Sequence, residues 1–577
     1  MQTIKTIIAK QIVEAVHSIN ADATLLVDEV KGLLEYPPDP NMGDLAFPCF
    51  RLSKVLRRAP AQIAESIVPL LSGGPIGSVE AVSGYLNIKI SNDYLTTKVL
   101  PQILSERETY GSQTFGKGKK VVLDYSSPNV AKPFHIGHLG TTVIGHSLRK
   151  LHEFAGYDCF GINYLGDWGT QFGKLIVAYR LWGNKEDVEK EGVDALVALY
   201  VRVNNEIKGD PEKGIPENKE LADAARAEFH KLETGDEENL ALWKWFVSIS
   251  LAEYEKTYKQ LGITFDSYLG ESFYTDKMPA QVQKLRDMGL LKIDDGASIV
   301  DLSEYNMPPC LILKRDGSTL YPTRDIAAAV YRKEHYHFDK AIYVTSAQQC
   351  LHFAQWFKVV ELMGYPWYNE LVHVPYGTVS LNGEKLATRT GNVVLLKDLF
   401  ALAIEKVKKV MAEKNPNLEN RDRIAEQVGV GAVVFYYLTN NRMKDINFVL
   451  DEALNFDGNT GPYVQYTYAR TCSVLAKAGK ISEASGAITT EEEAALLKTL
   501  CRFGERVAAA IDDYEPSYIT RFILDVATAF NRFYHNCPIL SAEDEGTRNL
   551  RLSLTDATRT VLGNAFDLIC LAKTEKV

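Results

Sequence analysis

The chain has 577 residues, of which 46% are hydrophobic and 24% are charged, and its formal net charge is −10. No stretch approaches the roughly 18 consecutive apolar residues that a membrane span requires. The acidic balance argues weakly against nonspecific nucleic-acid binding, which needs clustered Lys and Arg. The length exceeds what one hydrophobic core can organise, so we expect about three to four domains.

Residues 1–110 are predicted to form a small α+β module. Apolar residues recur with helical period over 4–20 and 60–72, and short strand candidates occupy 79–82 and 85–90. The first helical segment lacks the long apolar stretch of a signal peptide. The eight cysteines are scattered, without a C-x-x-C pair or zinc-ligand spacing. These features predict a cytoplasmic protein with reduced thiols and no metal site.

A doubly wound, Rossmann-like parallel sheet is predicted for residues 111–397. After a polar linker, strand-like runs alternate with helical patterns, as in nucleotide-binding α/β domains. The strand-like runs are 121–124, 158–164, 298–302, 310–314, 340–345 and 371–375. Residues 184–266 are polar, charged and helical in pattern, so we expect a helical insertion within this domain.

Beyond residue 398 the strand signals almost vanish. Long helical patterns continue to residue 577, and no internal repeat or low-complexity tract stands out. We therefore expect residues 398–577 to form an α-helical bundle.

The segment 128–138 joins the apolar strand that ends at Asp124 to helical character that starts near Leu139. It brings Lys132, His135, Gly137 and His138 to a predicted helix N-terminus, where free backbone N–H groups and the helix dipole favour anionic oxygen. Glycine also lets a ligand approach the backbone closely. This segment therefore predicts a phosphate-binding turn.

A second candidate element is the loop 383–391. Lys385 and Arg389 lie four residues apart between Gly383 and Gly391. Two cations on a mobile glycine-flanked loop could close over a triphosphate and neutralise charge on a pyrophosphate leaving group. The alternative is a solvated turn that happens to carry a lysine and an arginine.

The two elements together resemble the H-I-G-H and K-M-S-K-S motifs of class I aminoacyl-tRNA synthetases. The surrounding sequence is similar to arginyl-tRNA synthetases in several blocks that follow the family's order. These blocks are 126–139, 163–173, 321–328, 348–352 and 461–466. Residues 1–110 match the family's N-terminal tRNA-contacting module in size and position.

The resemblance implies an arginine–tRNA ligase. The enzyme would use ATP with Mg²⁺ to convert L-arginine to arginyl-adenylate, and would then transfer the arginyl group to the 3′-terminal ribose of tRNA(Arg). It implies a monomer whose first step depends on bound tRNA, with residues 398–577 as the anticodon-binding domain. The rivals are another class I ligase or nucleotidyltransferase, and a catalytically silent RNA-binding paralogue.

The resemblance also assigns the phosphate-binding residues. His135 and His138 would donate hydrogen bonds to phosphate oxygens, and Lys132 would act as a cationic clamp. Lys385 and Arg389 would close over the β- and γ-phosphates. Gly137 and Gly383 complete the predicted ATP site.

An arginine substrate presents a planar guanidinium that pairs with a carboxylate through two parallel hydrogen bonds. By resemblance, Asp325 is the guanidinium ligand, and Tyr321 supplies a hydroxyl and an aromatic wall one helical turn earlier. By resemblance, and because it lies at the carboxyl end of its strand, Asp124 is a second candidate partner for the substrate guanidinium. Without the family match, Asp325 reads as an aspartate that caps a helix or lies in its first turn, beside Arg324.

The other end of the amino acid has two predicted ligands. Asn129 and Gln349 resemble the family's contacts to the α-amino and backbone end of arginine. The neighbouring Gln348 is the alternative to Gln349 if the match is shifted by one residue.

Tyr463 and Tyr466 resemble the family's aromatic residues that stack on anticodon bases. Their i, i+3 spacing is equally typical of two aromatic core residues. Two positions depart from the family pattern: Gly140 replaces the usual arginine, and Arg389 replaces the second lysine of the loop. The resemblance implies that a lysine upstream of the histidine motif compensates for the second change, and Lys132 occupies that place.

Overall fold

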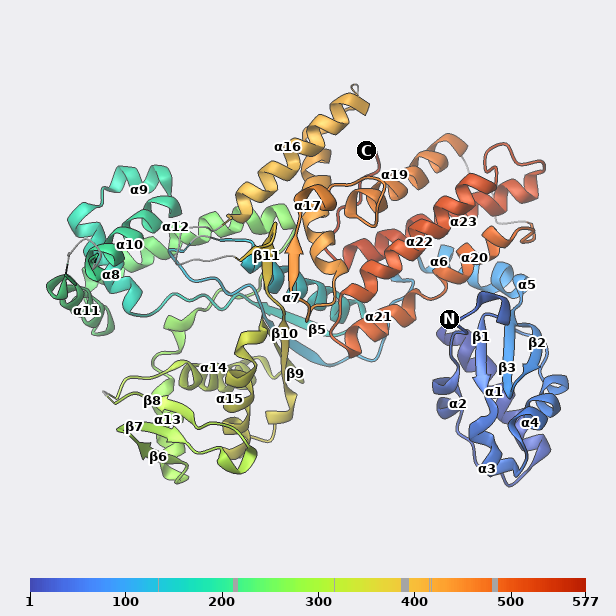
Figure 1. Ribbon diagram of the computed structural model, residues 1–577, viewed down its shortest axis with the longest axis horizontal. Helices are drawn as coiled ribbons and strands as arrows, with labels where there is room; N and C mark the ends of the chain where they lie inside the picture. Colours follow the sequence, from blue (N-terminus) through green and yellow to red (C-terminus); the bar gives the residue numbers. More distant parts are fainter. Residues whose placement is uncertain are drawn as a thin grey trace.

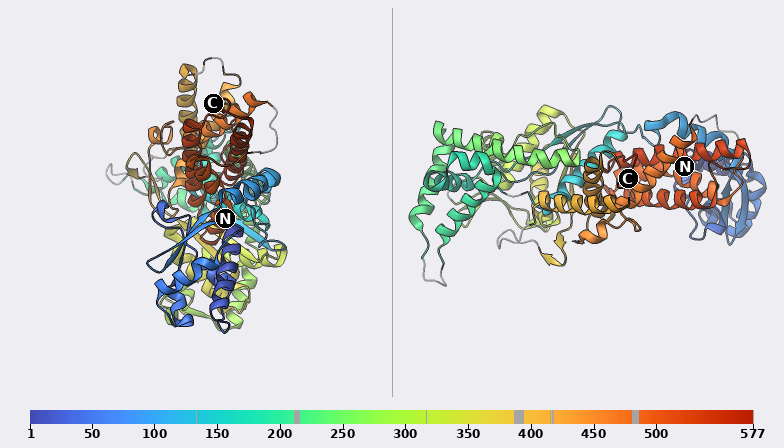
Figure 2. Two further views of the ribbon diagram at one scale, coloured as in Figure 1. Left: turned by 90° about the vertical axis from the view of Figure 1, so that its right-hand side faces the viewer. Right: turned by 90° about the horizontal axis from the view of Figure 1, so that it is seen from above.

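The computed structural model describes residues 1–132, 134–210, 216–315, 317–385, 394–414, 416, 418–479 and 486–576. The molecule is elongated (Figure 1). A helical insertion forms one end, the N-terminal module forms the other, and a parallel sheet and the C-terminal helices lie between them. The view from above in Figure 2 shows the same order along the long axis.

The N-terminal module is the expected α+β unit. Its antiparallel sheet has the order β1-β3-β2, from β1 (Leu45–Pro48), β2 (Ile76–Val82) and β3 (Tyr85–Ile90). Ser83 and Gly84 join β2 to β3, and both have positive φ angles (51° and 83°), as a tight two-residue hairpin requires. The helices α1 (Gln2–Ile19) and α4 (Pro60–Ile67) supply buried apolar residues to the same core.

The predicted parallel sheet of the middle part of the chain has four strands in the order β10-β9-β4-β5. They are β4 (Lys120–Asp124), β5 (Asp158–Ile162), β9 (Lys340–Ser346) and β10 (Leu371–Tyr376). From β4 the chain runs through α7 (Gly137–Phe154) to one side, and from β9 it runs through α15 (Cys350–Leu362) to the other. The strand order therefore reverses between β4 and β9, which is where open α/β sheets bind ligands.

The prediction that the runs 298–302 and 310–314 belong to the parallel sheet is wrong. They form β7 (Ala297–Val300) and β8 (Cys310–Leu313) of a separate antiparallel sheet with β6 (Leu291–Asp294). Asp295 and Gly296, with φ angles of 46° and 78°, make a two-residue turn between β6 and β7. So short a connection can join only antiparallel strands, because a parallel pair needs a crossover of a dozen residues or more.

The helical insertion has its own apolar core, separate from that of the sheet. It contains α8 (Thr170–Trp182), α9 (Lys185–Glu191), α10 (Val193–Lys208), α11 (Lys219–Glu233) and α12 (Glu237–Leu261). It thus begins before the predicted bound at 184, because the buried side chains of α8 belong to the same core. The long helix α12 runs back toward the sheet, where the buried hydroxyls of Tyr254 and Tyr258 bond to the segment that follows β4. The insertion is thereby tied to the predicted phosphate-binding turn.

The C-terminal part is the expected helix bundle. Its long helices are α16 (Leu396–Lys414), α17 (Arg421–Thr439), α19 (Gly461–Ala478), α20 (Glu491–Leu500), α21 (Phe503–Asp512), α22 (Ser517–Asn536) and α23 (Glu545–Asp567). In the described residues of this part, one short strand interrupts the helices: β13 (Ile446–Phe448) pairs with β11 (Val379–Leu381). In the part of the chain that the structure describes, no helix is long and apolar enough to cross a bilayer.

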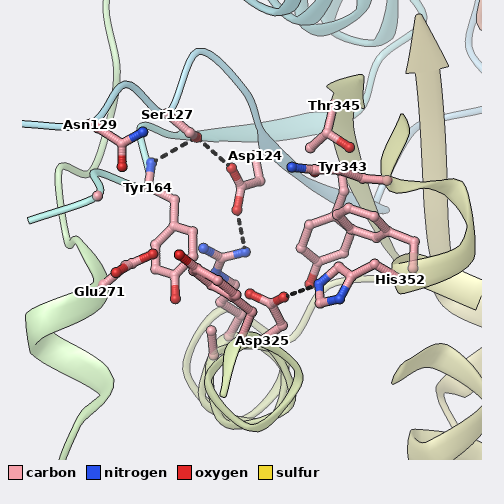
Figure 3. A pocket seen from close by; sticks show the side chains of 15 residues that line it. Asp124, Ser127, Asn129, Tyr164, Glu271, Asp325, Tyr343, Thr345 and His352 are labelled. Atoms are coloured by element: carbon pink, nitrogen blue, oxygen red, sulfur yellow. Dashed lines mark hydrogen bonds and ion pairs between the residues drawn. The ribbon is translucent and has the colours of Figure 1, made fainter. Parts of the chain in front are cut away.

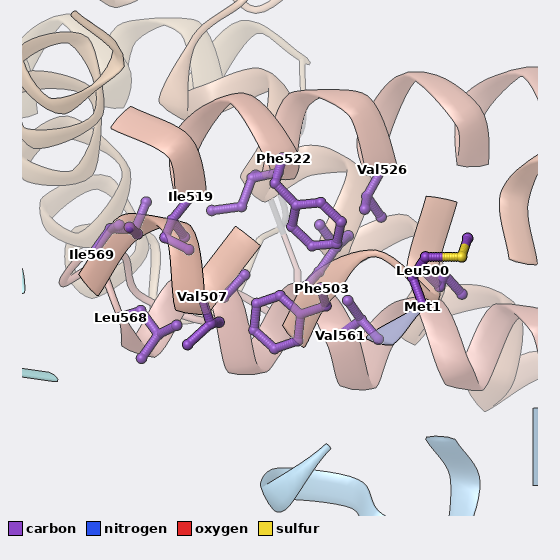
Figure 4. Close-up of a cluster of buried hydrophobic side chains, with 14 of the residues drawn as sticks. Met1, Leu500, Phe503, Val507, Ile519, Phe522, Val526, Val561, Leu568 and Ile569 are labelled. Atoms are coloured by element: carbon purple, nitrogen blue, oxygen red, sulfur yellow. The ribbon is translucent and has the colours of Figure 1, made fainter. Parts of the chain in front are cut away.

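The N-terminal module packs on this bundle. Met1 is buried among apolar side chains of the C-terminal helices, including Leu500 and Phe503 (Figure 4). The rings of Phe503 and Phe522 stack at a centroid distance of 5.2 Å within the same cluster. Residues from both ends of the chain therefore share one hydrophobic core.

Candidate active site

A cavity of about 340 Å³ lies at the carboxyl ends of β4 and β9, at the switch point of the sheet. Side chains converge on it from both strands, from α14 (Tyr321–Tyr336) and from the start of α15 (Figure 3). The lining residues are Asp124, Ser127, Asn129, Tyr164, Gly166, Glu271, Tyr321, Asp325, Ala328, Arg332, Tyr343, Thr345, Gln349, His352 and Phe353. The structure thus brings the five predicted arginine-binding residues to one pocket.

One face of α14 forms a wall of this pocket. Tyr321, Asp325, Ala328 and Arg332 follow one another at helical spacing, and all four line the cavity. Tyr321 is the first residue of the helix and is 67% exposed, whereas Arg332 is 1% exposed. The wall therefore runs from an open aromatic end to a buried cationic end. The interpretation of Asp325 as a capping or first-turn aspartate is wrong, because Leu320 is the N-cap residue and the first turn of α14 has no acidic residue.

Asp325 is held by the start of α15. Its Oδ2 lies 2.6 Å from Nε2 of His352, and both side chains are about a quarter exposed. Gln349 is the N-cap residue of α15 and lines the pocket. Gln348 is not one of the described residues that line it. The position of Gln349 on the pocket wall favours it over its neighbour as a substrate contact.

Asp124 is already paired with a guanidinium of the protein itself. Nη1 of Arg332 donates to Oδ2 of Asp124 at 2.7 Å, and the Ser127 hydroxyl donates to Oδ1 at 2.9 Å. Burial raises the pKa of Asp124, and Arg332 opposes that shift. The rings of Tyr164, Tyr274 and Tyr343 surround the Arg332 guanidinium at 5.0 to 5.8 Å. Both oxygens of Asp124 therefore have internal partners.

The sequence reasoning missed two charged residues of this pocket, Arg332 and Glu271. Glu271 faces the cavity and forms an ion pair with Arg324 at 2.5 Å. Burial raises its pKa to about 7, with further increases from the Asp325 and Asp167 carboxylates and opposition from Arg324. Arg332 could have been found, because it continues the helical spacing that relates Tyr321 to Asp325. Glu271 belongs to none of the recognised motifs, and no spacing pattern in the sequence relates it to the other pocket residues.

The predicted phosphate-binding turn forms the start of α7. The backbone N–H of His135 donates to Nδ1 of His138 at 3.2 Å, and that of Gly137 donates to Nδ1 of His135 at 3.1 Å. An Nδ1 that accepts a hydrogen bond carries no proton, so Nε2 of each neutral ring is the N–H donor. Burial lowers the pKa of His135 to about 4 and that of His138 to about 3. Near pH 7 the turn therefore offers two neutral donors.

Along the chain, Lys132 lies between Asn129 of the pocket and His135 of this turn. The hydroxyl of Tyr254 donates to the carbonyl oxygens of both Asn129 and Lys132 at 2.8 Å, so one side chain of α12 fixes the segment that connects the two sites. Burial lowers the pKa of Lys132, and Glu271 partly opposes that effect.

The second predicted element is only partly described. Lys385 belongs to β12 (Glu384–Lys385), which pairs with β11, and Gly383 donates its N–H to Oδ1 of Asn447 at 2.7 Å. Arg389 lies outside the described residues. Where the description resumes, the chain runs beside the histidine turn: the N–H of Ile136 donates to the carbonyl oxygen of Val394 at 3.2 Å. The described chain just beyond the candidate loop therefore lies against the candidate phosphate site.

Comparisons with known proteins agree with this geometry. Three family models match the chain: "Arginyl tRNA synthetase N terminal domain" over residues 2–90, "tRNA synthetases class I (R), catalytic domain" over 99–450, and "DALR anticodon binding domain" over 464–577. The chain belongs to the arginyl-tRNA synthetase family. The fold prediction of an α+β N-terminal unit, a parallel catalytic sheet and a helical C-terminal domain is confirmed.

Curated relatives extend over nearly the whole chain. An arginine–tRNA ligase of Alkaliphilus metalliredigens is 49% identical over 95% of this chain and 96% of its own length. One of Clostridioides difficile is 48% identical over 100% of both. Among solved structures, the Thermus thermophilus arginyl-tRNA synthetase covers 98% of this chain and 99% of its own, at 25% identity and a TM-score of 0.82.

The departure from the family pattern at Gly140 has a packing explanation. Gly140 lies in α7 against α17, and a Cβ at this position would meet the hydroxyl oxygen of Tyr437 at 2.2 Å and a ring carbon of Tyr376 at 3.0 Å. A larger residue would require these buried rings to move. Gly140 is thus matched to its own helix–helix contact, so it gives no support to a catalytically silent protein.

The two tyrosines predicted for the anticodon domain differ in their surroundings. Tyr466 is 44% exposed on α19, with Arg470 4.9 Å above its ring, and Arg470 also lies over Tyr534 of α22. Tyr463 is partly buried, and its hydroxyl accepts a hydrogen bond from Asn531 at 2.9 Å. Of the pair, Tyr466 has the face available for stacking.

Proposed function

We infer that the protein is an arginine–tRNA ligase, which uses ATP to join L-arginine to tRNA(Arg). The observation that carries this inference is a pocket with three carboxylates, at the switch point of a class I sheet and next to a turn of two neutral histidines. Full-length relatives named arginine–tRNA ligase support the same reading.

The substrate guanidinium would pair with Asp325, beside the hydroxyl of Tyr321 and opposite Glu271. A planar guanidinium bonds carboxylates with fixed geometry, and partial burial strengthens such charge-assisted bonds. Asn129, Gln349 and the Asp124 end of the pocket would receive the α-amino and carboxylate groups. The open end at Tyr321 and the polar lining between these groups support that orientation.

The substrate carboxylate would then attack the α-phosphorus of ATP, forming arginyl-adenylate as pyrophosphate leaves. Nε2–H of His135 and of His138 would donate to phosphate oxygens, and Gly137 would admit the nucleotide close to the backbone. Lys132, Lys385 and Arg389 would neutralise charge on the leaving group, with Gly383 at the start of the loop that carries Lys385 and Arg389. No protein nucleophile is needed, because positioning and charge stabilisation carry the reaction.

Mg²⁺ would enter with the nucleotide. Among the described residues, no group of three His, Cys, Asp or Glu side chains is placed to hold a metal ion. Mg²⁺ that accompanies a nucleotide is held largely by phosphate oxygens and water, and it would offset phosphate charge. In the second step, the 3′-terminal ribose hydroxyl of tRNA(Arg) would attack the arginyl carbonyl and release AMP.

The division of labour would follow the three parts of the chain. Residues 1–110 would contact the tRNA, 111–397 would carry the chemistry, and 398–577 would read the anticodon through Tyr466 and, less directly, Tyr463. We propose a cytoplasmic monomer. The exposed ring of Tyr466 under Arg470 is suited to stacking on an unpaired base.

ATP–pyrophosphate exchange and tRNA charging test the function. We expect L-arginine to support both, and exchange to require tRNA(Arg). The same assays with cysteine, glutamate and lysine, each at matched concentration, check the amino-acid class. Charging with one of these in preference to arginine would refute the proposal, and exchange without tRNA would refute only the tRNA dependence of the first step.

Lowering the pH from 8 to 6 is expected to raise the KM for arginine about five- to tenfold. A bound cation favours the ionised carboxylate, so affinity increases as the pH rises through about 7, the pKa of Glu271. Glu271→Gln should abolish this dependence, whereas the exposed Glu304→Gln should retain it. If the KM of Glu271→Gln follows pH as the wild type does, another group is responsible.

A further inference from the structure

His352 is the pocket residue in direct contact with the carboxylate that would select arginine. In the described part of the chain, the carboxylate of Asp325 has one side-chain hydrogen bond, to Nε2 of His352 at 2.6 Å. The two residues come from different helices, α14 and α15, and both line the cavity. Figure 3 shows the bond at the pocket wall.

The helix that carries His352 is firmly anchored. Phe353, Trp356, Val359 and Val360 of α15 are all buried in the core that also contains β9 and β10 residues. The ring of Phe353 stacks on that of His373 at 4.2 Å and lies edge-on to that of His352 at 5.5 Å. His352 therefore lies on a rigid helix whose position relative to α14 is fixed by packing.

Asp325 itself has little other restraint. Its side chain is 22% exposed, so water reaches it. The neighbouring cations on α14 are occupied elsewhere, since Arg324 pairs with Glu271 and Arg332 with Asp124. Without the imidazole N–H, the carboxylate would be free to rotate and would have to be ordered by the incoming substrate, which reduces affinity.

We propose that His352 is a positioning residue for amino-acid selection: its Nε2–H fixes the Asp325 carboxylate in the orientation that receives the substrate guanidinium. This inference rests on the proposed role of Asp325. His352 acts through Asp325 and takes no part in phosphate chemistry. Its loss is therefore expected to weaken arginine binding while leaving ATP use and the turnover of bound substrate largely intact.

Three substitutions separate the donor from the bulk of the ring. In His352→Gln, the side-chain amide nitrogen can occupy the position of the imidazole Nε2 and donate to Asp325. In His352→Asn, the shorter side chain places its amide nitrogen only at the position of Nδ1. His352→Ala removes both the donor and the ring. We expect His352→Ala and His352→Asn to raise the KM for arginine about five- to twentyfold, with kcat and the KM for ATP changed less than about threefold. His352→Gln should restore the KM to within about threefold of wild type.

A control on the same helix is Gln355→Ala. Gln355 lies one turn further along α15 and bonds to the carbonyl oxygens of Pro308 and Pro309, away from the cavity. It should keep the wild-type KM for arginine. Steady-state charging with each substrate varied in turn provides all the constants, and circular dichroism checks that every variant is folded.

The outcomes are distinct. An unchanged KM in His352→Ala, equal effects of Gln and Asn, or a fall in kcat with constant KM would each overturn the role of His352. A wild-type enzyme that fails to use arginine would overturn the proposed function instead, whatever the variants do.

Discussion

Arg332→Leu is expected to lower the free energy of unfolding by about 3–5 kcal/mol, the usual effect of removing one partner of a buried ion pair. The guanidinium of Arg332 is buried between three tyrosine rings and bonds to Asp124 at 2.7 Å. Leucine would leave the carboxylate of Asp124 in the same buried place without a cation. Urea unfolding followed by tryptophan fluorescence would measure the loss, since Trp356 and Trp367 belong to the neighbouring core.

The destabilisation should increase with pH. Burial already raises the pKa of Asp124 in the folded protein, and losing Arg332 would raise it further. The folded state then keeps a proton that the unfolded state releases near its ordinary pKa of about 3.9. Stability is therefore lost as the pH rises from the unfolded pKa through the folded one, and the penalty should be larger at pH 8 than at pH 5.

Two controls test the cause. The double variant Asp124→Asn with Arg332→Leu removes both charges and should recover a large part of the loss. Arg315→Leu breaks the exposed ion pair with Asp295 and should cost less than about 1 kcal/mol. If the double variant is as unstable as Arg332→Leu, the loss comes from packing and not from an unpaired carboxylate.

Asp325→Ala is expected to reduce kcat/KM for arginine by about 10- to 150-fold, which corresponds to the roughly 1.5–3 kcal/mol of a hydrogen bond to a charged group. Asp325 lies on the pocket wall between Tyr321 and Arg332, with one oxygen held by His352. The KM for ATP should change less than about twofold, because the phosphate turn is a separate segment. Arginine-dependent charging at several concentrations of each substrate measures both constants.

Asp325→Asn keeps the size of the side chain and removes its charge, so it should lose nearly as much as Asp325→Ala. Asp301→Ala, on an exposed surface beyond β7, is the matched control and should behave as the wild type. Unchanged use of arginine by Asp325→Ala would remove this residue from the binding site.

The sequence alone predicted the elements that depend on local patterns. The strands at 121–124, 158–164, 340–345 and 371–375 are present in the parallel sheet, and the hydrophobic period of the last third predicted its helices. The predicted pocket residues come from blocks whose spacing is local, such as Tyr321 and Asp325 one turn apart on α14. The runs at 298–302 and 310–314 have equally clear strand patterns, but these local patterns do not indicate which sheet a strand joins.

Local sequence patterns do not show which residues far apart in the chain contact each other. Asp124 was expected to face a substrate guanidinium, and the structure gives it the guanidinium of Arg332, 208 positions away. The contact between His352 and Asp325 likewise depends on α15 packing beside α14. Glu271 enters the pocket from a short turn after the insertion, far in sequence from every motif.

Residue periodicity, turn chemistry and the order of the motif blocks determined the class of fold and the family, since these depend on neighbours within a few helical turns or one strand. The partner of each buried charge, the sheet that each strand joined and the fit of Gly140 against Tyr437 were decided by the tertiary structure. These contacts connect segments separated by tens to hundreds of residues, and their energy comes from the desolvation and packing of whole elements, which local sequence does not encode.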